Sequence, residues 1–537
     1  MDIEFELKAY IEAGSDLGNA DIGRYINEAE NLLKGGGSSP AKTKVIEWEI
    51  CGESKNKIFL HIASNRYVRA HDALVRIRKH LAQKLGKEHR IGIRGVYGKE
   101  YNIKLTSGKF SELIKNKDDN PSIANISPLP ENEVIFDRDS GSITLKISDM
   151  SEEFLTKNMV DRLIRRFEAK VRAIGTGGKG DFTKLIEKSS KKDYILCNDP
   201  TAEIIDRGWV KEFPGAGVWI FMPQYAKLVS AIRDIFVEEV ALKLDFDEIY
   251  LPRLIPLDVE RKKGHLNIAN EIFWVSPPKS RDPGFFEDYS DLVEITYETH
   301  PDHLDKKLRE PMFGLSYAQC EPYYQIFEGE IISNENLWKV YDVNGPTWRW
   351  EGGGLRGLER LNEFHRIEFV YTGSPENVVE ARDAVLRETM RVTEEIFDLE
   401  WKVESTTAVY LEHAGKDEDD AAGRDVDKPE SDKGLDDIVK TYDLCAILPF
   451  KTASRDEAEL EVASFHVHRD FYAKRFHWKE KKKRELWSGC CGIGPTRFAF
   501  SFIARWGFDA DKWPDAVKKR IGKIPDFPSF ENWPKIK

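Results

Sequence analysis

Apolar and polar residues alternate at the start of the chain, in MDIEFELKAY, and again in VIEWEI (residues 45–50) and KIFLHIA (residues 57–63). A period of two is typical of strands that bury one face. Between them, residues 34–42 (KGGGSSPAK) have the composition of a flexible connection. The pattern therefore predicts a first strand and then a hairpin or a small sheet.

A helical period follows. Apolar residues recur at intervals of four, three, four and four along one stripe, at Ala70, Leu74, Ile77, Leu81 and Leu85. Polar residues lie off that stripe and are expected on the surface, at Arg76, Lys79, Gln83 and Lys87. We expect the helix to end at Gly86 and IGIRGVYG to return to strand. Residues 1–165 are thus predicted to form one domain, a sheet covered by helices.

The remainder, residues 166–537, is predicted to be a second and larger domain. Residues 159–189 have the pattern of a helical connector, and GTGGKG within it (175–180) indicates a loose turn because it lacks the full phosphate-loop pattern. Long helices and alternating strands follow, up to a helix at 496–505. Residues 415–434 are almost all charged or small, which is typical of a mobile surface loop.

Composition narrows the class of protein. The chain has 537 residues, of which 41% are hydrophobic, and no apolar run approaches the ~20 residues of a membrane span. The N-terminus is not that of a signal peptide, and six scattered cysteines suit a reduced cytosol, so we expect a cytoplasmic protein without membrane attachment. The net charge is −12, yet residues 66–94 hold nine Lys or Arg and two acids. Such a basic patch favours an anionic partner.

One stretch carries most of the candidate chemistry: residues 337–372, LWKVYDVNGPTWRWEGGGLRGLERLNEFHRIEFVYT, with the pattern strand, glycine-rich loop, strand. Arg349 and Glu351 are expected on one face of the first strand. On the second strand, Phe364, Arg366, Glu368 and Val370 share a face. Two paired strands would therefore present two arginines, two glutamates and a phenylalanine to one cleft. Arginine forks suit phosphate oxygens and a phenylalanine suits the flat face of a base. A ladder of salt bridges on an open sheet face is the alternative.

These residues resemble motif 2 of the class II aminoacyl-tRNA synthetases. GIGPTRFAFSFI (492–503) resembles motif 3, and VSAIRDIFVEEVALKLDFDEIYLPRLIPL (229–257) resembles motif 1. The closer resemblance is to the methanogen-type (type 2) seryl-tRNA synthetases. It spans nearly the whole chain and rests on RYVRAHDALVRIRKHL, IGIRGV, KKGH, PPKSRDP, SYAQCEPYY, GLERLNEFHRIE and ELWSGC. It implies an α+β fold, with an antiparallel class II catalytic sheet, a separate N-terminal tRNA-binding domain and a homodimer.

The resemblance also implies roles for single residues. Arg349 would hold the α-phosphate of ATP and Arg497 the γ-phosphate, and these two are the expected catalytic residues. The adenylate moiety would be bound or stacked by Glu351, Arg360 and Phe364. The zinc ion of the family would have three protein ligands, Cys320, Glu368 and Cys490. This set leaves a fourth position open, as in catalytic zinc sites.

Further positions follow from the same resemblance. Glu461 and Ser464 have the spacing of the residues that bind Mg²⁺ with ATP in class II enzymes. The amino-acid pocket would include Arg366, Val409 and His466. Contacts to tRNA would come from Arg76, Lys79, Lys157 and Asn158.

Three of these positions depart from the family pattern. Val409 stands where the family has tryptophan, and Ser464 and His466 stand where it commonly has asparagine and serine. The resemblance as a whole nevertheless implies a ligase that charges tRNA-Ser with serine, through a seryl-adenylate whose amino group zinc holds. It leaves two alternatives: a paralogue that activates another small amino acid for tRNA or for a carrier protein, and a non-catalytic RNA-binding protein on a synthetase scaffold.

Overall fold

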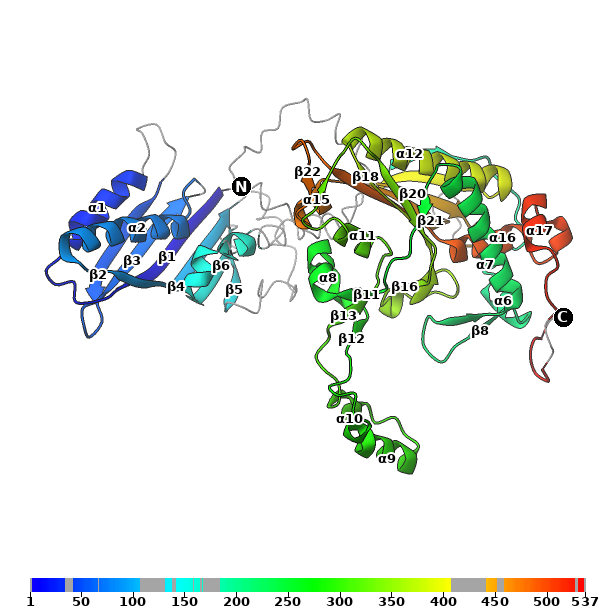
Figure 1. Ribbon diagram of the computed structural model, residues 1–537, viewed down its shortest axis with the longest axis horizontal. Helices are drawn as coiled ribbons and strands as arrows, with labels where there is room; N and C mark the ends of the chain where they lie inside the picture. Colours follow the sequence, from blue (N-terminus) through cyan, green and yellow to red (C-terminus); the bar gives the residue numbers. More distant parts are fainter. Residues whose placement is uncertain are drawn as a thin grey trace. The chain divides into compact units, whose positions relative to one another are not determined.

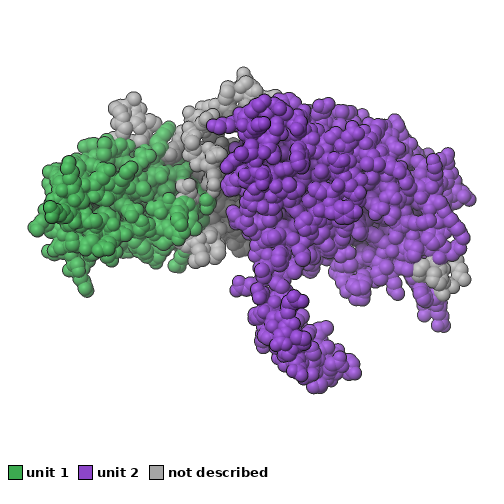
Figure 2. Space-filling model, viewed as in Figure 1, with its two compact units in different colours: residues 1–180 green, residues 181–537 purple. Residues whose placement is uncertain are grey.

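The computed structural model divides into two compact units, residues 1–180 and 181–537 (Figure 2). It describes residues 2–33, 42–65, 67–106, 131–137, 142–157, 159–164, 167, 184–406, 441–451, 458–526 and 530–535. Among these residues, no helix combines the length and the apolar character that crossing a membrane demands.

Unit 1 is an antiparallel sheet with helices packed on one face. In the described residues the strand order is β2-β3-β1-β4-β6-β5. The strands are β1 (Asp2–Ala13), β2 (Lys44–Cys51), β3 (Lys57–Asn65), β4 (Ile93–Thr106), β5 (Asn132–Asp137) and β6 (Ser142–Met150). The helices are α1 (Ile22–Leu33), α2 (Ala70–His89) and α4 (Glu152–Thr156). A single core lies between helices and sheet, because alternate side chains of each strand point toward the helices.

Helix α2 confirms the predicted stripe, since its five apolar residues are buried and Arg76, Lys79, Gln83 and Lys87 lie off the buried face. The predicted end at Gly86 is wrong. The helix continues to His89 and ends where Arg90 takes a left-handed conformation, with its N–H donating to the Leu85 carbonyl. An exposed glycine inside a helix costs only ~1 kcal/mol, which the packing of the stripe offsets.

Unit 2 is built on a second sheet, with the order β10-β15-β18-β23-β21-β20-β19-β7 in the described residues. Only the short pair β10 and β15 is parallel among these strands, so the predicted α+β class with an antiparallel sheet is confirmed. The strands are β7 (Lys184–Lys188), β10 (Asp247–Glu248), β15 (Trp338–Asp342), β18 (Ile367–Gly373), β19 (Trp401–Thr406), β20 (Thr441–Ile447), β21 (Glu459–Arg469) and β23 (Trp487–Ile493).

The two faces of this sheet differ. One face packs against the helices α7 (Pro223–Phe236), α12 (Pro375–Arg391) and α16 (Pro495–Trp506) in the largest core cluster of the described residues. The other face carries a smaller apolar cluster with α8 (Leu257–Lys263), α11 (Glu321–Gln325) and α15 (Phe471–Arg475). Strand residues of opposite parity therefore face a thick apolar layer on one side and a thinner, more polar layer on the other.

Strand β7 corrects the predicted helical connector at 159–189. Residues 159–164 are helical, but residues 184–188 pair with β19 at the edge of the sheet. The partner strand lies more than 200 residues further along the chain, so no local pattern could indicate this pairing. The GTGGKG turn and the charged loop at 415–434 lie outside the described residues.

Shorter elements surround the sheet. An arm extends from β12 (Trp274–Val275) and β13 (Phe313–Leu315) and ends in α9 (Glu287–Thr296) and α10 (Pro301–Asp305) (Figure 1). The other strands are β8 (Val210–Glu212), β9 (Trp219–Phe221), β11 (Leu254–Pro256), β14 (Ile331–Ile332), β16 (Pro346–Trp348), β17 (Glu363–His365) and β22 (Lys479–Glu480). The other helical segments are α6 (Thr201–Asp206), η2 (Val237–Leu242), η3 (His265–Glu271), η4 (Pro283–Phe286), η5 (Gly352–Gly354), η6 (Val392–Ile396), η10 (Ala510–Lys512) and α17 (Asp515–Ile521).

Candidate active site

A cavity of about 430 Å³ lies on the thinly covered face of the unit 2 sheet. Its lining comes from residues far apart in the sequence, between Lys263 and Arg497. The five side chains that the sequence predicted to share one cleft all line it: Arg349, Glu351, Phe364, Arg366 and Glu368. Arg349 and Glu351 follow the end of β16 at Trp348 and so lie in the loop, not on the strand that the sequence predicted.

The Arg349 guanidinium lies close to two aromatic rings. Its guanidinium carbon lies 4.1 Å from the ring centre of Tyr317 and 5.5 Å from that of Phe364. The Tyr317 hydroxyl donates to Glu271 at 2.8 Å. Cation–π contacts restrict the position of the guanidinium, whose N–H groups suit oxygen ligands. No pattern in the sequence gave Tyr317 a role, although it belongs to the SYAQCEPYY string, because this residue contributes through its ring.

Arg360 does not line the cavity, and its side chain is 55% exposed. Its Nε donates to Glu351 Oε2 at 2.5 Å, and Glu351 itself lines the cavity. Arg497, in the first turn of α16, donates to the carbonyl oxygens of Glu359 (3.0 Å) and Glu461 (2.8 Å). Burial lowers the pKa of Arg497. Arg349 and Arg497 therefore both belong to the lining of one cavity, held there by different elements.

Three candidate metal ligands meet at the other part of the cavity. Ligand atoms of Cys320, Glu368 and Cys490 all lie within 4.8 Å of one another, and the three residues are buried. The antiparallel register aligns Glu368 with Gly492 and Val370 with Cys490, so Glu368 and Cys490 project from the same face of the sheet. Cys320 arrives from the turn before α11.

The chemistry of these three groups fits a zinc ion. Glu368 Oε1 has no hydrogen-bond partner among the described residues, although the side chain is fully buried. Burial raises the pKa of Glu368 to about 8, and the Arg366 guanidinium, 2.6 Å away, opposes that rise. The hydrogen bond between the two thiols lowers the pKa of Cys320 and raises that of Cys490. These three buried groups lack a neutralising positive charge, and a divalent cation would supply it.

Gly492 lies directly against the side chain of Arg366. A Cβ at this position would overlap the guanidinium of Arg366, which reaches past the strand to Glu368. The first glycine of GIGPTR is thus explained by a close approach next to the cluster.

Two further side chains contact the sulfurs. Lys263 Nζ donates to Cys320 Sγ at 3.4 Å, and His468 Nε2 lies 3.5 Å from Cys490 Sγ. Burial opposes the charge on Lys263, but the Cys320 sulfur and other nearby groups raise its pKa above the ordinary value. No pattern in the sequence indicated either contact, although Lys263 belongs to the KKGH string.

A second buried cluster lies next to the first. His265 Nδ1 is 2.6 Å from Glu321 and 3.3 Å from Glu260, all three buried. Burial and the Glu321 carboxylate raise the pKa of Glu260 to about 7. The 2.6 Å contact is that of a charge-assisted hydrogen bond. We interpret this cluster as a buried ion-pair network that joins α8 to α11.

The residues expected near magnesium and the amino-acid side chain lie on β21. Glu461, Ser464 and His466 line the cavity, with Thr441 and Asp443 from β20 beside them. His466 bridges Ser464 Oγ and Thr441 Oγ1, each 3.1 Å away, and burial lowers its pKa to about 3. His466 is therefore neutral near pH 7. Val409 lies outside the described residues.

The residues expected to contact tRNA lie in unit 1. Arg76 and Lys79 lie on α2, away from its buried stripe. Lys157, which follows α4, is exposed and pairs with Glu153 at 2.8 Å. Asn158 lies outside the described residues.

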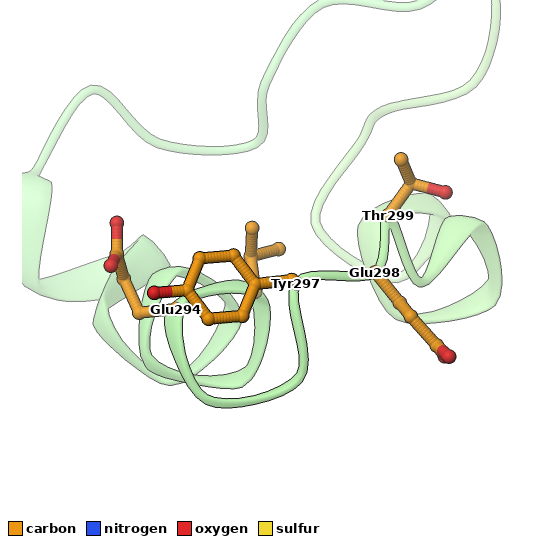
Figure 3. Close-up of a pocket in the computed structure, with 5 residues that line it drawn as sticks. Glu294, Tyr297, Glu298 and Thr299 are labelled. Carbon is orange, nitrogen blue, oxygen red and sulfur yellow. The ribbon is translucent and has the colours of Figure 1, made fainter.

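A shallow hollow at the tip of the arm is a second concavity (Figure 3). Its lining includes Glu294, Tyr297 and Glu298, and the two carboxylates point away from each other in Figure 3. The lining contains no basic side chain, so it does not suit the chemistry of the large cavity.

Unit 2, with its antiparallel sheet and arginine-lined cavity, belongs to a chain that is similar over nearly its full length to a solved SerRS, a class II aminoacyl-tRNA synthetase. Unit 1 matches a domain family of its own: the family model described as a tRNA-binding domain covers residues 3–169.

Relatives that match over nearly the whole chain show which family of synthetases it belongs to. The type-2 serine–tRNA ligase of Methanococcoides burtonii is 35% identical over 535 residues, covering 98% of this chain and 99% of the relative. That of Methanocaldococcus jannaschii is 36% identical over 520 residues, covering 94% and 92%. A crystal structure of M. kandleri SerRS in complex with A. aeolicus tRNASec is similar with a TM-score of 0.76 and 33% identity, covering 99% of this chain and 100% of that one. The chain belongs to the type-2 serine–tRNA ligase family, as its sequence motifs predicted.

Proposed function

We propose that this protein charges tRNA-Ser with serine in two steps, through a seryl-adenylate, with zinc and magnesium as its metal ions. The observation that carries the proposal is the single cavity in which Arg349 and Arg497 share a lining with the buried set Cys320, Glu368 and Cys490. An arginine-lined region suits a nucleotide, and the metal-ligating region suits an amino acid.

Activation is a displacement at phosphorus. The carboxylate of serine attacks the α-phosphorus of ATP and pyrophosphate leaves. Arg349 would offset charge on the α-phosphate and Arg497 charge on the γ-phosphate, while Phe364 would stack on the adenine. Glu351 and Arg360, paired at 2.5 Å, would hold the remaining edge of the adenylate.

The two metal ions would have different roles. Cys320, Glu368 and Cys490 would hold zinc, which when bound offers an open position for the amino group of the substrate. Glu461 and Ser464, two residues of β21 on the cavity wall, would hold magnesium together with the phosphates of ATP. The acyl group then passes to the terminal ribose of tRNA, and this step needs no protein nucleophile.

The remaining features favour tRNA over a carrier protein as acceptor. A tRNA-binding-domain model matches residues 3–169, and the full-length relatives share this unit. Arg76, Lys79, Lys157 and Asn158 would contact phosphates there, which position a nucleic acid without reading its sequence. His466, with Arg366 and Val409, would lie near the side chain of the amino acid.

We also propose a homodimer. Apolar side chains are exposed along the motif 1 segment (229–257), where Leu242 is 54% exposed, Tyr250 75% and Leu254 50%. Exposed apolar groups in one region are typical of a protein interface.

The test is ATP–pyrophosphate exchange with each of the twenty amino acids, with and without a zinc chelator. We expect exchange with serine alone, abolished by chelation and restored by zinc. Exchange that responds only to another small amino acid would make the chain a paralogue of different specificity. A chain that binds no ATP in calorimetry would instead be a non-catalytic RNA-binding protein.

A further inference from the structure

Lys263 is a buried cation at the last residue of α8, and its surroundings are unusual. Its relative exposure is 3%, and within the described residues no carboxylate oxygen lies within 4.0 Å of its ammonium group. Its hydrogen bond is to Cys320 Sγ, at 3.4 Å. Buried lysines are ordinarily paired with an anion. Here the anion in contact with the ammonium is the Cys320 sulfur, while Glu321 and Cys490 act on it from further away.

Aromatic rings hold the ammonium in place. Lys263 Nζ lies 4.9 Å from the ring centre of Tyr324 and 4.7 Å from that of Tyr472. The two rings are themselves stacked, with centres 4.0 Å apart. Cation–π contacts stabilise a desolvated ammonium and restrict its position. The chain thus fixes a positive charge beside one sulfur of the cluster.

The negative charge of the cluster explains why an ammonium group lies beside the Cys320 sulfur. Two thiolates and a carboxylate carry one negative charge more than a zinc ion neutralises. Strong donation from the sulfurs would weaken the attraction of the metal for the amino group of the substrate. An N–H donor to a thiolate withdraws electron density from that sulfur, and such outer contacts tune both affinity and reactivity of a metal site.

We propose that Lys263 is a positioning residue of this metal site: its ammonium orients the Cys320 sulfur and limits the donation of that sulfur, so that the substrate amine binds tightly. The inference rests on the proposed zinc site. The amino acid binds as a free amine, and its ammonium proton leaves to the solvent.

Cobalt is the probe, because sulfur-to-cobalt charge-transfer bands report directly on thiolate donation. In the full-length protein loaded with Co²⁺, Lys263→Met removes the donor, so the band moves to longer wavelength. The KM for serine rises by about tenfold or more, while the KM for ATP and kcat change little. Lys263→Arg retains an N–H donor and a charge and restores both readouts toward native values.

The matched control is Lys262→Met. Lys262 is the neighbouring lysine of α8, and its ammonium is paired with Asp258 at 2.7 Å and with Glu328 at 2.6 Å instead of with the cluster. Its substitution should leave the band and the serine KM unchanged. If Lys263→Met fails to fold in a thermal melt, Lys263→Gln replaces it and shifts the band in the same direction by a smaller amount.

The outcomes separate the two proposals. A native protein that takes up no cobalt or zinc refutes the proposed metal site itself. A native protein that binds cobalt, with a Lys263→Met or Lys263→Gln variant of unaltered band and unaltered serine KM, overturns the role of Lys263 alone. Equal shifts in the Lys262→Met control would also overturn it.

Discussion

Cys490 and Cys491 are neighbours in the chain but face opposite sides of the catalytic sheet. Cys490 joins the cluster with Cys320 and Glu368, whereas the Cys491 sulfur lies 3.3 Å from the Tyr371 hydroxyl in the apolar core. We expect Cys490→Ala to lose bound zinc and at least ~100-fold in serine-dependent pyrophosphate exchange. Elemental analysis of the purified protein measures the zinc.

Cys491→Ala is the control for this substitution. It removes a buried sulfur of the same strand and should cost roughly 1 kcal/mol of unfolding free energy while leaving one zinc per chain. Equal zinc content in the two variants would contradict the assignment of Cys490 as a ligand.

How much of the site the sequence could predict depends on chain distance. Arg349, Glu351 and Phe364 lie within one stretch, so a strand-loop-strand pattern was enough to predict a shared cleft, and all three line one cavity. Cys320, Glu368 and Cys490 are scattered, and only family resemblance grouped them. Lys263 and His468 could not be predicted, because their contacts depend on how α8 and β21 pack around the cluster.

The element that the sequence predicted best is α2, because its stripe is local and regular. The error at its end and the missed strand β7 have physical causes. Gly86 is tolerated inside the helix, and the helix ends instead at Arg90. Strand β7 exists through its pairing with Lys402–Ser405 of β19. Local periodicity predicts elements that bury one face, whereas an edge strand with five exposed residues carries no such pattern.

The packing of α2 on β4 predicts a dependence on pH. His71, 3% exposed, lies 2.9 Å from the Tyr101 hydroxyl and 3.4 Å from Asp161, with Asp72 and Arg69 also nearby. Burial lowers its pKa to about 4, although Asp72 opposes this. The unfolded chain has a histidine pKa of about 6.5, so it takes up a proton that the folded chain refuses. The contribution of neutral, buried His71 to the free energy of unfolding is therefore fully present above pH 6.5. It is lost as the pH drops toward 4.

Hydrogen exchange of α2 and β4 amides in the intact chain, corrected for intrinsic rates, measures this effect. We expect the free energy of opening to fall by at most ~3 kcal/mol between pH 7 and pH 4. In His71→Gln the free energy of opening should fall less over this range. A variant with the same pH dependence as the native chain would assign the effect to other groups.

On the scale of the whole molecule, the two units predict a separation of tasks. Arg76 and Lys79 lie on α2 of unit 1, while the cavity belongs to unit 2. The double variant Arg76→Gln, Lys79→Gln should leave tRNA-independent pyrophosphate exchange unchanged and weaken tRNA binding. The slope of log K against log salt should fall by about one for each phosphate that the variant no longer neutralises.

Filter binding of tRNA over a series of salt concentrations provides the measurement. Lys512→Gln, Lys519→Gln removes the same charge from exposed positions of unit 2 and is the control. If both double variants lowered the salt slope equally, the effect would come from net charge and not from a site on α2.

The proposed homodimer gives a prediction at the same scale. A two-fold interface contains each residue twice, so a substitution at Tyr250 removes two large apolar side chains and inserts two charges. Burying one such side chain contributes about 1.5–3 kcal/mol, so Tyr250→Lys should weaken the dimer by ~100-fold or more. Sedimentation velocity at ~1 µM should give the native protein twice the 61.8 kDa of one chain, and Tyr250→Lys a lower mass.

Ile295→Lys is the control for the dimer, because it removes an exposed apolar group outside the motif 1 segment. Ile295 lies on α9 and is 79% exposed, close to the 75% of Tyr250, so the two substitutions differ in place more than in exposure. A native protein that sediments as a single chain would disprove the dimer. If both variants sedimented as single chains, the proposed interface at the motif 1 segment would be disproved, because a two-fold contact weakens only where its own residues change.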